Sequence, residues 1–156
     1  MSLQLQAIQQ LLTAHSDKAA VEANNKFIPG EKRVYGVRNP VVNDLAKQFK
    51  EGGYTLIQEL WQAGAYEERL MAVKMIGYVA KKEPANALQC VQDFATELDN
   101  WAICDTLGTQ SLKPIVKTHQ EQIFALAKKY NLSKDLWQRR LSVSYTHLTL
   151  PTIYSV

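Results

Sequence analysis

The sequence predicts an all-α protein, a helical-repeat α-solenoid built from antiparallel helix pairs. Apolar residues recur at helical spacing along most of the chain, and the period-two alternation of strands is missing through residue 142. Proline and glycine separate the helical segments at short intervals, which predicts tight turns. Many short helices joined by tight turns favour stacked helix pairs over a four-helix bundle.

The helix boundaries follow from residues that start or stop helices. Pro29-Gly30 predicts a turn. Asn39 is expected to cap the helix that follows, with Pro40 at its first position, where the missing N–H costs nothing. Ser133 is a natural N-cap for the last helix. In chain order, the expected helices cover residues 3–14, 17–25, 40–51, 54–63, 66–82, 84–97, 100–112, 119–130 and from 134 onward.

A weak internal repeat supports the stacked-pair interpretation. Residues 69–73 (Arg-Leu-Met-Ala-Val) match residues 139–143 (Arg-Arg-Leu-Ser-Val) in the first, fourth and fifth positions, with Ala and Ser taken as equivalent small residues. The offset from residue 69 to residue 139 is 70 residues. Two helix pairs of about 35 residues each would produce it, and that period lies within the range of helical solenoids.

We expect one helical-repeat domain over residues 1–143, incomplete at its C-terminal end, followed by a tail of different character. Residues 144–156 contain three threonines and a proline, and they carry no charge apart from His147. Their propensity favours strand over helix. A composition change within a predicted helix indicates a non-native join, so the tail is expected to be non-native or irregular. A native edge strand is the alternative.

Composition places the chain among ordinary globular proteins. It has 156 residues, of which 46% are hydrophobic and 21% are charged. No apolar run is long enough to span a bilayer and the N-terminus has no signal-peptide pattern, so we expect no membrane contact. We expect a cytoplasmic protein and a monomer. Cys90 and Cys104 lack metal-ligand spacing and indicate buried thiols in a reducing compartment. We expect no metal site and no cofactor.

The charge distribution is uneven. Residues 1–112 contain 11 Lys/Arg and 13 Asp/Glu, whereas residues 113–140 contain seven Lys/Arg and two Asp/Glu. Clustered bases release counterions when they meet a nucleic-acid backbone, so this stretch, which includes Lys113, Lys117 and Arg139, is a candidate phosphate-binding surface. The alternative is a solvated helix face.

Asp105 is the strongest candidate for a functional residue. It is the only acid or base expected to be charged between residues 101 and 112, in a helix that Asp99 or Asn100 can cap. Trp101 lies one turn earlier on the same face. A carboxylate on so apolar a helix needs donors or a cationic partner, and an aromatic ring beside it suits a cationic ligand. The alternative is a core aromatic beside a hydrogen-bonded structural acid.

Two further motifs are weaker candidates for a functional role. Adjacent side chains diverge on a helix, so Glu67-Glu68 is predicted to be a solvated turn rather than a catalytic pair. The Tyr35-Gly36-Val37 segment is interpreted either as a loop that places an aromatic near DNA or as a packed loop. There is no phosphate-binding loop, catalytic triad order or metal motif.

Four motifs together resemble the AlkD-type DNA alkylation repair proteins, which are helical-repeat DNA glycosylases. The resemblance covers roughly residues 5–143. Its carriers, in order, are Tyr35-Gly36-Val37-Arg38-Asn39-Pro40, Leu60-Trp61 with residues 67–73, Asn100-Trp101 through Asp105, and Trp137-Gln138-Arg139-Arg140.

The resemblance implies a HEAT-like solenoid whose basic concave face holds double-stranded DNA. It implies hydrolysis of the N-glycosidic bond of cationic N3- or N7-alkylated purines. Asp105 would be the catalytic carboxylate, Trp101 the ring against the lesion's deoxyribose, and Arg140 a phosphate contact. We add Arg139, Lys113, Lys117 and Tyr35 as candidate DNA contacts. Some members bind unusual DNA without excising bases, so a non-catalytic nucleic-acid-binding module is an alternative, as is a protein-binding scaffold.

Overall fold

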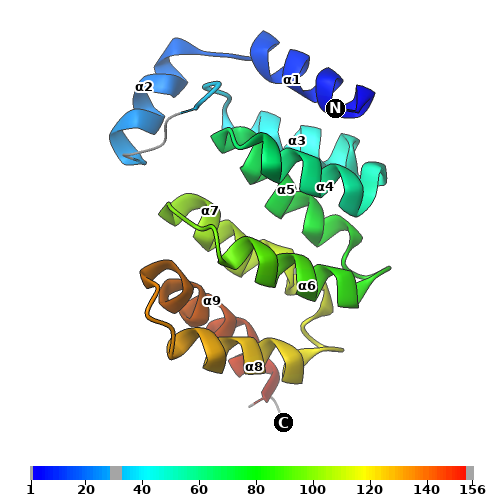
Figure 1. The fold of residues 1–156 in the computed structure, drawn as a ribbon, viewed down its shortest axis with the longest axis vertical. Coiled ribbons are helices and arrows are strands. Elements are labelled where there is room, and N and C mark those ends of the chain that lie inside the picture. The colour runs from blue at the N-terminus through cyan, green and yellow to red at the C-terminus, as the bar shows by residue number, and fades with distance from the viewer. Residues whose placement is uncertain (1, 29–32, 154–156) are drawn as a thin grey trace. The chain divides into compact units, whose positions relative to one another are not determined.

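In the computed structural model, which describes residues 2–28 and 33–153, every regular element of the described part is a helix (Figure 1). The predicted all-α fold class is therefore confirmed. The Pro29-Gly30 turn lies outside the described residues. The α-helices are α1 (Leu3–Ala14), α2 (Lys18–Phe27), α3 (Asn39–Gln48), α4 (Gly53–Ala63), α5 (Tyr66–Val79), α6 (Pro84–Ala95), α7 (Trp101–Thr106), α8 (Gln120–Asn131) and α9 (Leu136–Ile153).

The chain divides into two compact units, Met1–Met75 and Ile76–Val156, called here the N-terminal and the C-terminal unit. Each is described by itself. The prediction that residues 1–143 form one domain stays a prediction. None of the described helices is long and apolar enough to cross a bilayer.

The N-terminal unit is held by an apolar core with capped helices around it. Ser2 caps α1 by accepting from the amide of Leu5, and Asp17 caps α2 by accepting from Ala19. Helix α3 begins at Asn39 with Arg38 before it, so the predicted Asn39 cap is wrong by one residue. Fully buried core side chains come from four helices: Ile8, Leu12, Val42, Ala46, Ile57, Leu60, Met71 and Val73.

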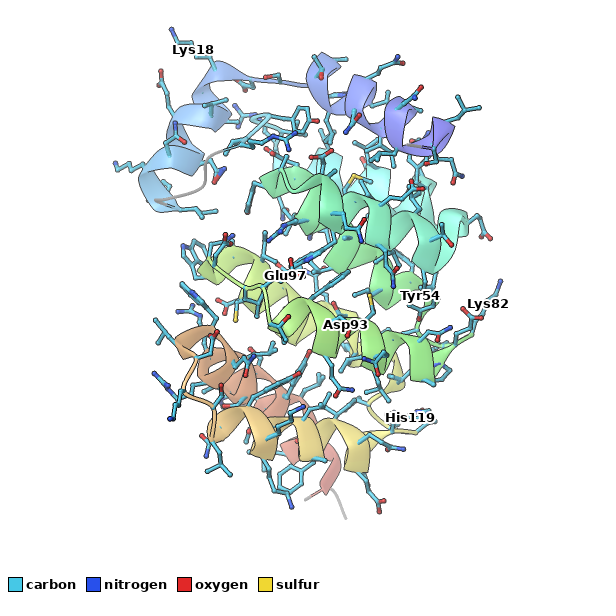
Figure 2. The ribbon with its side chains drawn as sticks, in the orientation of Figure 1. Lys18, Tyr54, Lys82, Asp93, Glu97 and His119 are labelled. Carbon is cyan, nitrogen blue, oxygen red and sulfur yellow. The ribbon has the colours of Figure 1, made fainter. Side chains whose placement is uncertain are left out.

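The C-terminal unit contains two antiparallel helix pairs, α6 with α7 and α8 with α9 (Figure 1). Lys82 and His119, labelled in Figure 2, precede the first helix of each pair and so mark corresponding points of the two pairs. The second helices of successive pairs, α5, α7 and α9, begin at residues 66, 101 and 136, and both 101 − 66 and 136 − 101 equal 35. The predicted period of about 35 residues is confirmed.

The helix predicted over residues 100–112 is shorter and changes its winding. Helix α7 ends at Thr106. The chain continues as a π-helical segment, η2 (Leu107–Ser111), and then as the 3-10 helix η3 (Lys113–Ile115). The hydroxyl of Thr109 donates to the Asp105 carbonyl at 2.8 Å. That carbonyl is the acceptor an α-helix would give to the Thr109 amide, so the side chain competes with α-helical winding there.

The tail does not behave as predicted. Residues 144–153 continue α9 as a helix, so the expected strand or irregular structure is wrong over that range. Tyr145 is fully buried, and its hydroxyl donates to the Leu107 carbonyl at 3.3 Å. The hydroxyls of Thr146 and Thr149 donate to carbonyls one turn earlier, at 2.8 and 2.9 Å. Tertiary burial therefore outweighs the weak helix propensity of these residues. The non-native origin of the tail stays a prediction.

Candidate functional site

The site around Asp105 begins with a buried cap at the start of α7. The side-chain oxygen of Asn100 accepts from the Ile103 amide at 2.9 Å, and Asn100 is itself buried. Asp99 does not cap the helix; its carboxylate accepts from the Asn100 side-chain amide at 3.2 Å. Of the two predicted caps, Asn100 is the one used. This cap fixes where α7 begins and therefore where Trp101 and Asp105 emerge.

Asp105 is held by a two-point ion pair within the C-terminal unit. The Nε of Arg140 donates to Oδ1 at 2.7 Å and its Nη2 donates to Oδ2 at 2.8 Å. The side chain of Asp105 is 37% exposed and that of Arg140 is 47% exposed. The predicted need for a cationic partner is confirmed, and the carboxylate remains open to solvent. The hydrogen bond to Asp105 raises the pKa of Arg140, so this side chain stays charged.

The repeat explains why these two residues meet. Arg140 follows Asp105 by 35 residues, so both occupy the same position in successive second helices, α7 and α9. Equivalent positions in neighbouring repeats lie next to each other when the repeats stack. The ion pair is therefore a side-chain bridge between two repeats at one register.

Trp101 contributes an aromatic surface one helical turn before Asp105. It is 41% exposed, so the alternative interpretation of a core aromatic is wrong. The buried face of α7 is formed instead by Ile103 and Cys104. Residues four apart share a helix face, so an indole and a carboxylate stand together at the surface of the C-terminal unit.

The remaining predicted contacts do not join this group. The Nη1 of Arg139 donates to the carbonyls of Ser133 and Lys134, at 3.0 and 2.9 Å, and closes the turn before α9. Lys113, the first residue of η3, and Lys117, two residues after η3, are both exposed. Tyr35 belongs to the other unit. No hydrogen bond or ion pair within the described part of the chain links these four residues to Asp105, and their roles stay predictions.

The two cysteines are poor nucleophiles. Burial raises the pKa of Cys90 and of Cys104 to about 12. The Cys104 thiol donates to the Trp137 carbonyl at 3.3 Å and faces away from solvent. Within residues 2–28 and 33–153, no three metal-ligating side chains come together. The groups that the structure brings together at this site are a carboxylate, an indole and a guanidinium.

The prediction of a solvated turn at Glu67-Glu68 is wrong. Glu67 is 1% exposed and Glu68 is fully buried in the N-terminal unit. Glu68 accepts from the Ala65 amide at 3.0 Å and from the side-chain amide of Gln9 at 2.9 Å. Adjacent residues do diverge on a helix, but α5 is covered on both of those faces. The mostly apolar residues 70–80, in which Lys74 is the one charged side chain, were the signal in the sequence that this helix is buried.

Glu67 organises the Tyr35-Gly36-Val37 segment. Its Oε1 accepts from the Tyr35 amide at 3.0 Å, and its Oε2 accepts from the amides of Gly36 and Val37 at 2.9 and 3.1 Å. Tyr35 is half-buried, and burial together with the negative charge of Glu68 raises the pKa of its hydroxyl. The backbone of this segment is packed against Glu67, as the packed-loop interpretation predicts.

Comparison with known families gives one match over nearly the whole chain. A family model described as DNA alkylation repair enzyme matches residues 8–151. Neither the curated proteins nor the solved structures gave a match. The matched range contains every residue of the site described above.

Proposed function

The chain belongs to the DNA alkylation repair enzyme family, and on that premise we propose that it hydrolyses the N-glycosidic bond of cationic N3- or N7-alkylated purines in duplex DNA. The family supports a role in DNA repair, with DNA as the partner. One observation supports the finer proposal: a partly exposed carboxylate, Asp105, is fixed by Arg140 and stands one turn from the exposed ring of Trp101. Monomeric state and cytoplasmic location stay predictions.

The proposed chemistry requires only one carboxylate. An N3- or N7-alkylated purine is already a cation, so it leaves as a neutral base, without prior protonation, when the C1′–N bond breaks and the bonding electrons go to the purine. Positive charge then develops on the sugar, and a nearby anion stabilises it, as in sugar hydrolysis. Asp105 would supply that anion and orient the water whose oxygen attacks C1′, and the proton that this water loses would pass to solvent. Fixed charge aimed at developing charge is usually the largest catalytic contribution.

Arg140 and Trp101 would place the DNA around that carboxylate. A guanidinium has five N–H donors, and the ion pair uses two of them. The other donors of this half-exposed group are available for a phosphate oxygen, so one side chain would hold both the backbone and the catalytic anion. The Trp101 ring would pack against the sugar and add a cation–π contribution of about 1–2 kcal/mol where water is excluded.

The test is release of free 7-methylguanine from an alkylated duplex, measured together with the abasic sites left behind. The proposal predicts equal amounts of both products. Duplex binding that weakens steeply with salt, without any release, would establish the alternative of a non-catalytic binding module. Absence of duplex binding at low salt would contradict both.

A further inference from the structure

The backbone of residues 35–37 forms a concave anion site, which the Glu67 carboxylate of the same chain occupies. Three successive amide N–H groups, from Tyr35, Gly36 and Val37, converge on the Glu67 carboxylate at 2.9–3.1 Å. Gly36 has a φ of +80°, and an added Cβ would lie 2.2 Å from a methyl carbon of Val21. Glycine is therefore required where the chain turns its amides inward.

Further backbone bonds fix the same segment on its other side. The Gly36 carbonyl accepts from the Asp17 amide at 2.8 Å, and the Tyr35 carbonyl accepts from the Ser16 hydroxyl at 2.5 Å. The Arg33 carbonyl accepts from the Tyr66 amide at 2.9 Å. A segment without helix or strand is thus held by amide and carbonyl bonds along most of its length.

The segment carries two exposed guanidinium groups. The Nη1 of Arg33 donates to the Ala63 carbonyl at 2.6 Å, and its Nη2 lies 3.8 Å from Glu68. Arg38 donates through Nε and Nη2 to one oxygen of Asp17, at 3.2 and 2.8 Å. Each guanidinium is anchored along one edge while most of its side chain stays in solvent. Groups held in this way lose little freedom when an outside anion binds.

We propose that residues 33–38 form a phosphate-binding surface of the N-terminal unit for the DNA backbone, and that Glu67 is its positioning residue. The proposal rests on DNA being the ligand, as in the proposed function, but not on base excision. Arg33 and Arg38 supply the charge, and Glu67 fixes the backbone from which both side chains extend. The surface would contact phosphates only, so it adds affinity without sequence preference.

The first experiment measures how the affinity for an unmodified DNA duplex changes with salt concentration. Each phosphate contact contributes about 0.9 to the slope of log K against log salt concentration. The combined variant Arg33→Gln/Arg38→Gln is expected to lower the slope by roughly 2 for its two contacts. Because Arg33 also bonds the Ala63 carbonyl and Arg38 bonds Asp17, circular dichroism first establishes that the variant is folded. An unchanged slope would overturn the proposal.

The second experiment separates positioning from net charge. Glu67→Gln removes a negative charge, which by charge alone would tighten DNA binding. We expect it instead to weaken binding at least threefold, because the neutral amide cannot accept from all three backbone N–H groups. The control Glu59→Gln removes the same charge from α4 of the same unit, where Glu59 bonds Ser2 and not the segment. Equal or tighter binding by Glu67→Gln would overturn the assignment.

A stability control completes the comparison. Ile8→Val reduces the buried core of α1 without touching residues 33–38 and is expected to bind DNA as the unchanged protein does. If it weakens binding as much as Glu67→Gln, Glu67 has only a structural role. Base release is measured separately from DNA binding. If the protein releases the base but the double arginine variant has the same salt slope, this inference alone is overturned. If the variant lowers the slope but the protein releases no base, only the excision chemistry is overturned.

Discussion

Asp105 in the C-terminal unit and Glu67 in the N-terminal unit are both carboxylates on the second helix of a repeat, and they bond different partners. Asp105 is partly exposed and bonds one exposed guanidinium side chain. Glu67 is buried and bonds three backbone amides. An anion that bonds a side chain at the surface is still accessible to a ligand. An anion that bonds backbone amides in the interior instead fixes the conformation of the chain. Glu67→Ala and Asp105→Asn test this contrast directly, and Gly108→Ala and the buried thiols test the packing of the C-terminal unit; the largest expected change in stability comes first.

Glu67→Ala is expected to lower the free energy of unfolding by about 3 kcal/mol or more. It leaves the buried amides of Gly36 and Val37 and the part-buried amide of Tyr35 without their acceptor, and each buried unpaired group costs about 1–3 kcal/mol. Urea denaturation followed by circular dichroism measures the change. A loss below about 1 kcal/mol would show that water or another group replaces the carboxylate easily.

Gly108→Ala is expected to cost about 1–3 kcal/mol through overpacking. An added Cβ would lie 2.4 Å from the Cβ of Ser144, where η2 packs against α9. The same denaturation measurement applies, and the second substitution Ser144→Gly should recover part of the loss by removing the opposing atom. No loss in the single variant would mean that residues 144–153 do not pack as a helix against η2.

Asp105→Asn is expected to change the free energy of unfolding by less than about 1 kcal/mol. Its partner is an exposed guanidinium, and exposed ion pairs contribute about 0.2–1 kcal/mol. Its melting temperature should stay close to that of the unchanged protein, in contrast to Glu67→Ala. A loss as large as that of Glu67→Ala would remove the distinction between the two carboxylates.

The buried thiols have the smallest expected effect on the free energy of unfolding at neutral pH. Because burial raises the pKa of Cys90 and Cys104 to about 12, the folded protein holds both protons more tightly than the unfolded chain. Their contribution to stability is complete below the ordinary thiol pKa and is lost as the pH rises from there toward 12. Iodoacetamide at pH 8 should label neither thiol in the folded protein and both in urea. Rapid labelling of the folded protein would contradict their burial.

Much of the fold could be predicted from local signals. Proline, glycine and capping residues fix the helix ends to within a few residues, because these side chains act on their own backbone. The pairing of Asp105 with Arg140 was also accessible, since a 35-residue period places the two at one register. The weak match between residues 69–73 and 139–143 contained that period, although the ion pair was not inferred from it.

The errors arose where tertiary contacts outweigh local preference. Glu67 and Glu68 look like surface charges because nothing nearby in the sequence reveals the amides of residues 35–37 or the Gln9 side chain. Residues 144–153 look like a strand, yet Tyr145 is buried against the Leu107 carbonyl and the segment remains helical. The amides that bond Glu67, the Gln9 side chain that bonds Glu68 and the Leu107 carbonyl that bonds Tyr145 all lie at least 30 residues away in the chain.

The most direct test of Asp105 as the catalytic anion is the single-turnover rate of 7-methylguanine release by Asp105→Asn on a saturating alkylated duplex. The account predicts a rate at least ~100-fold lower, the scale of losing one preorganised electrostatic group, with duplex binding retained. Asp99→Asn, which removes an exposed carboxylate next to the same helix, should release the base at the unchanged rate. Release by Asp105→Asn at the rate of the unchanged protein would contradict the account.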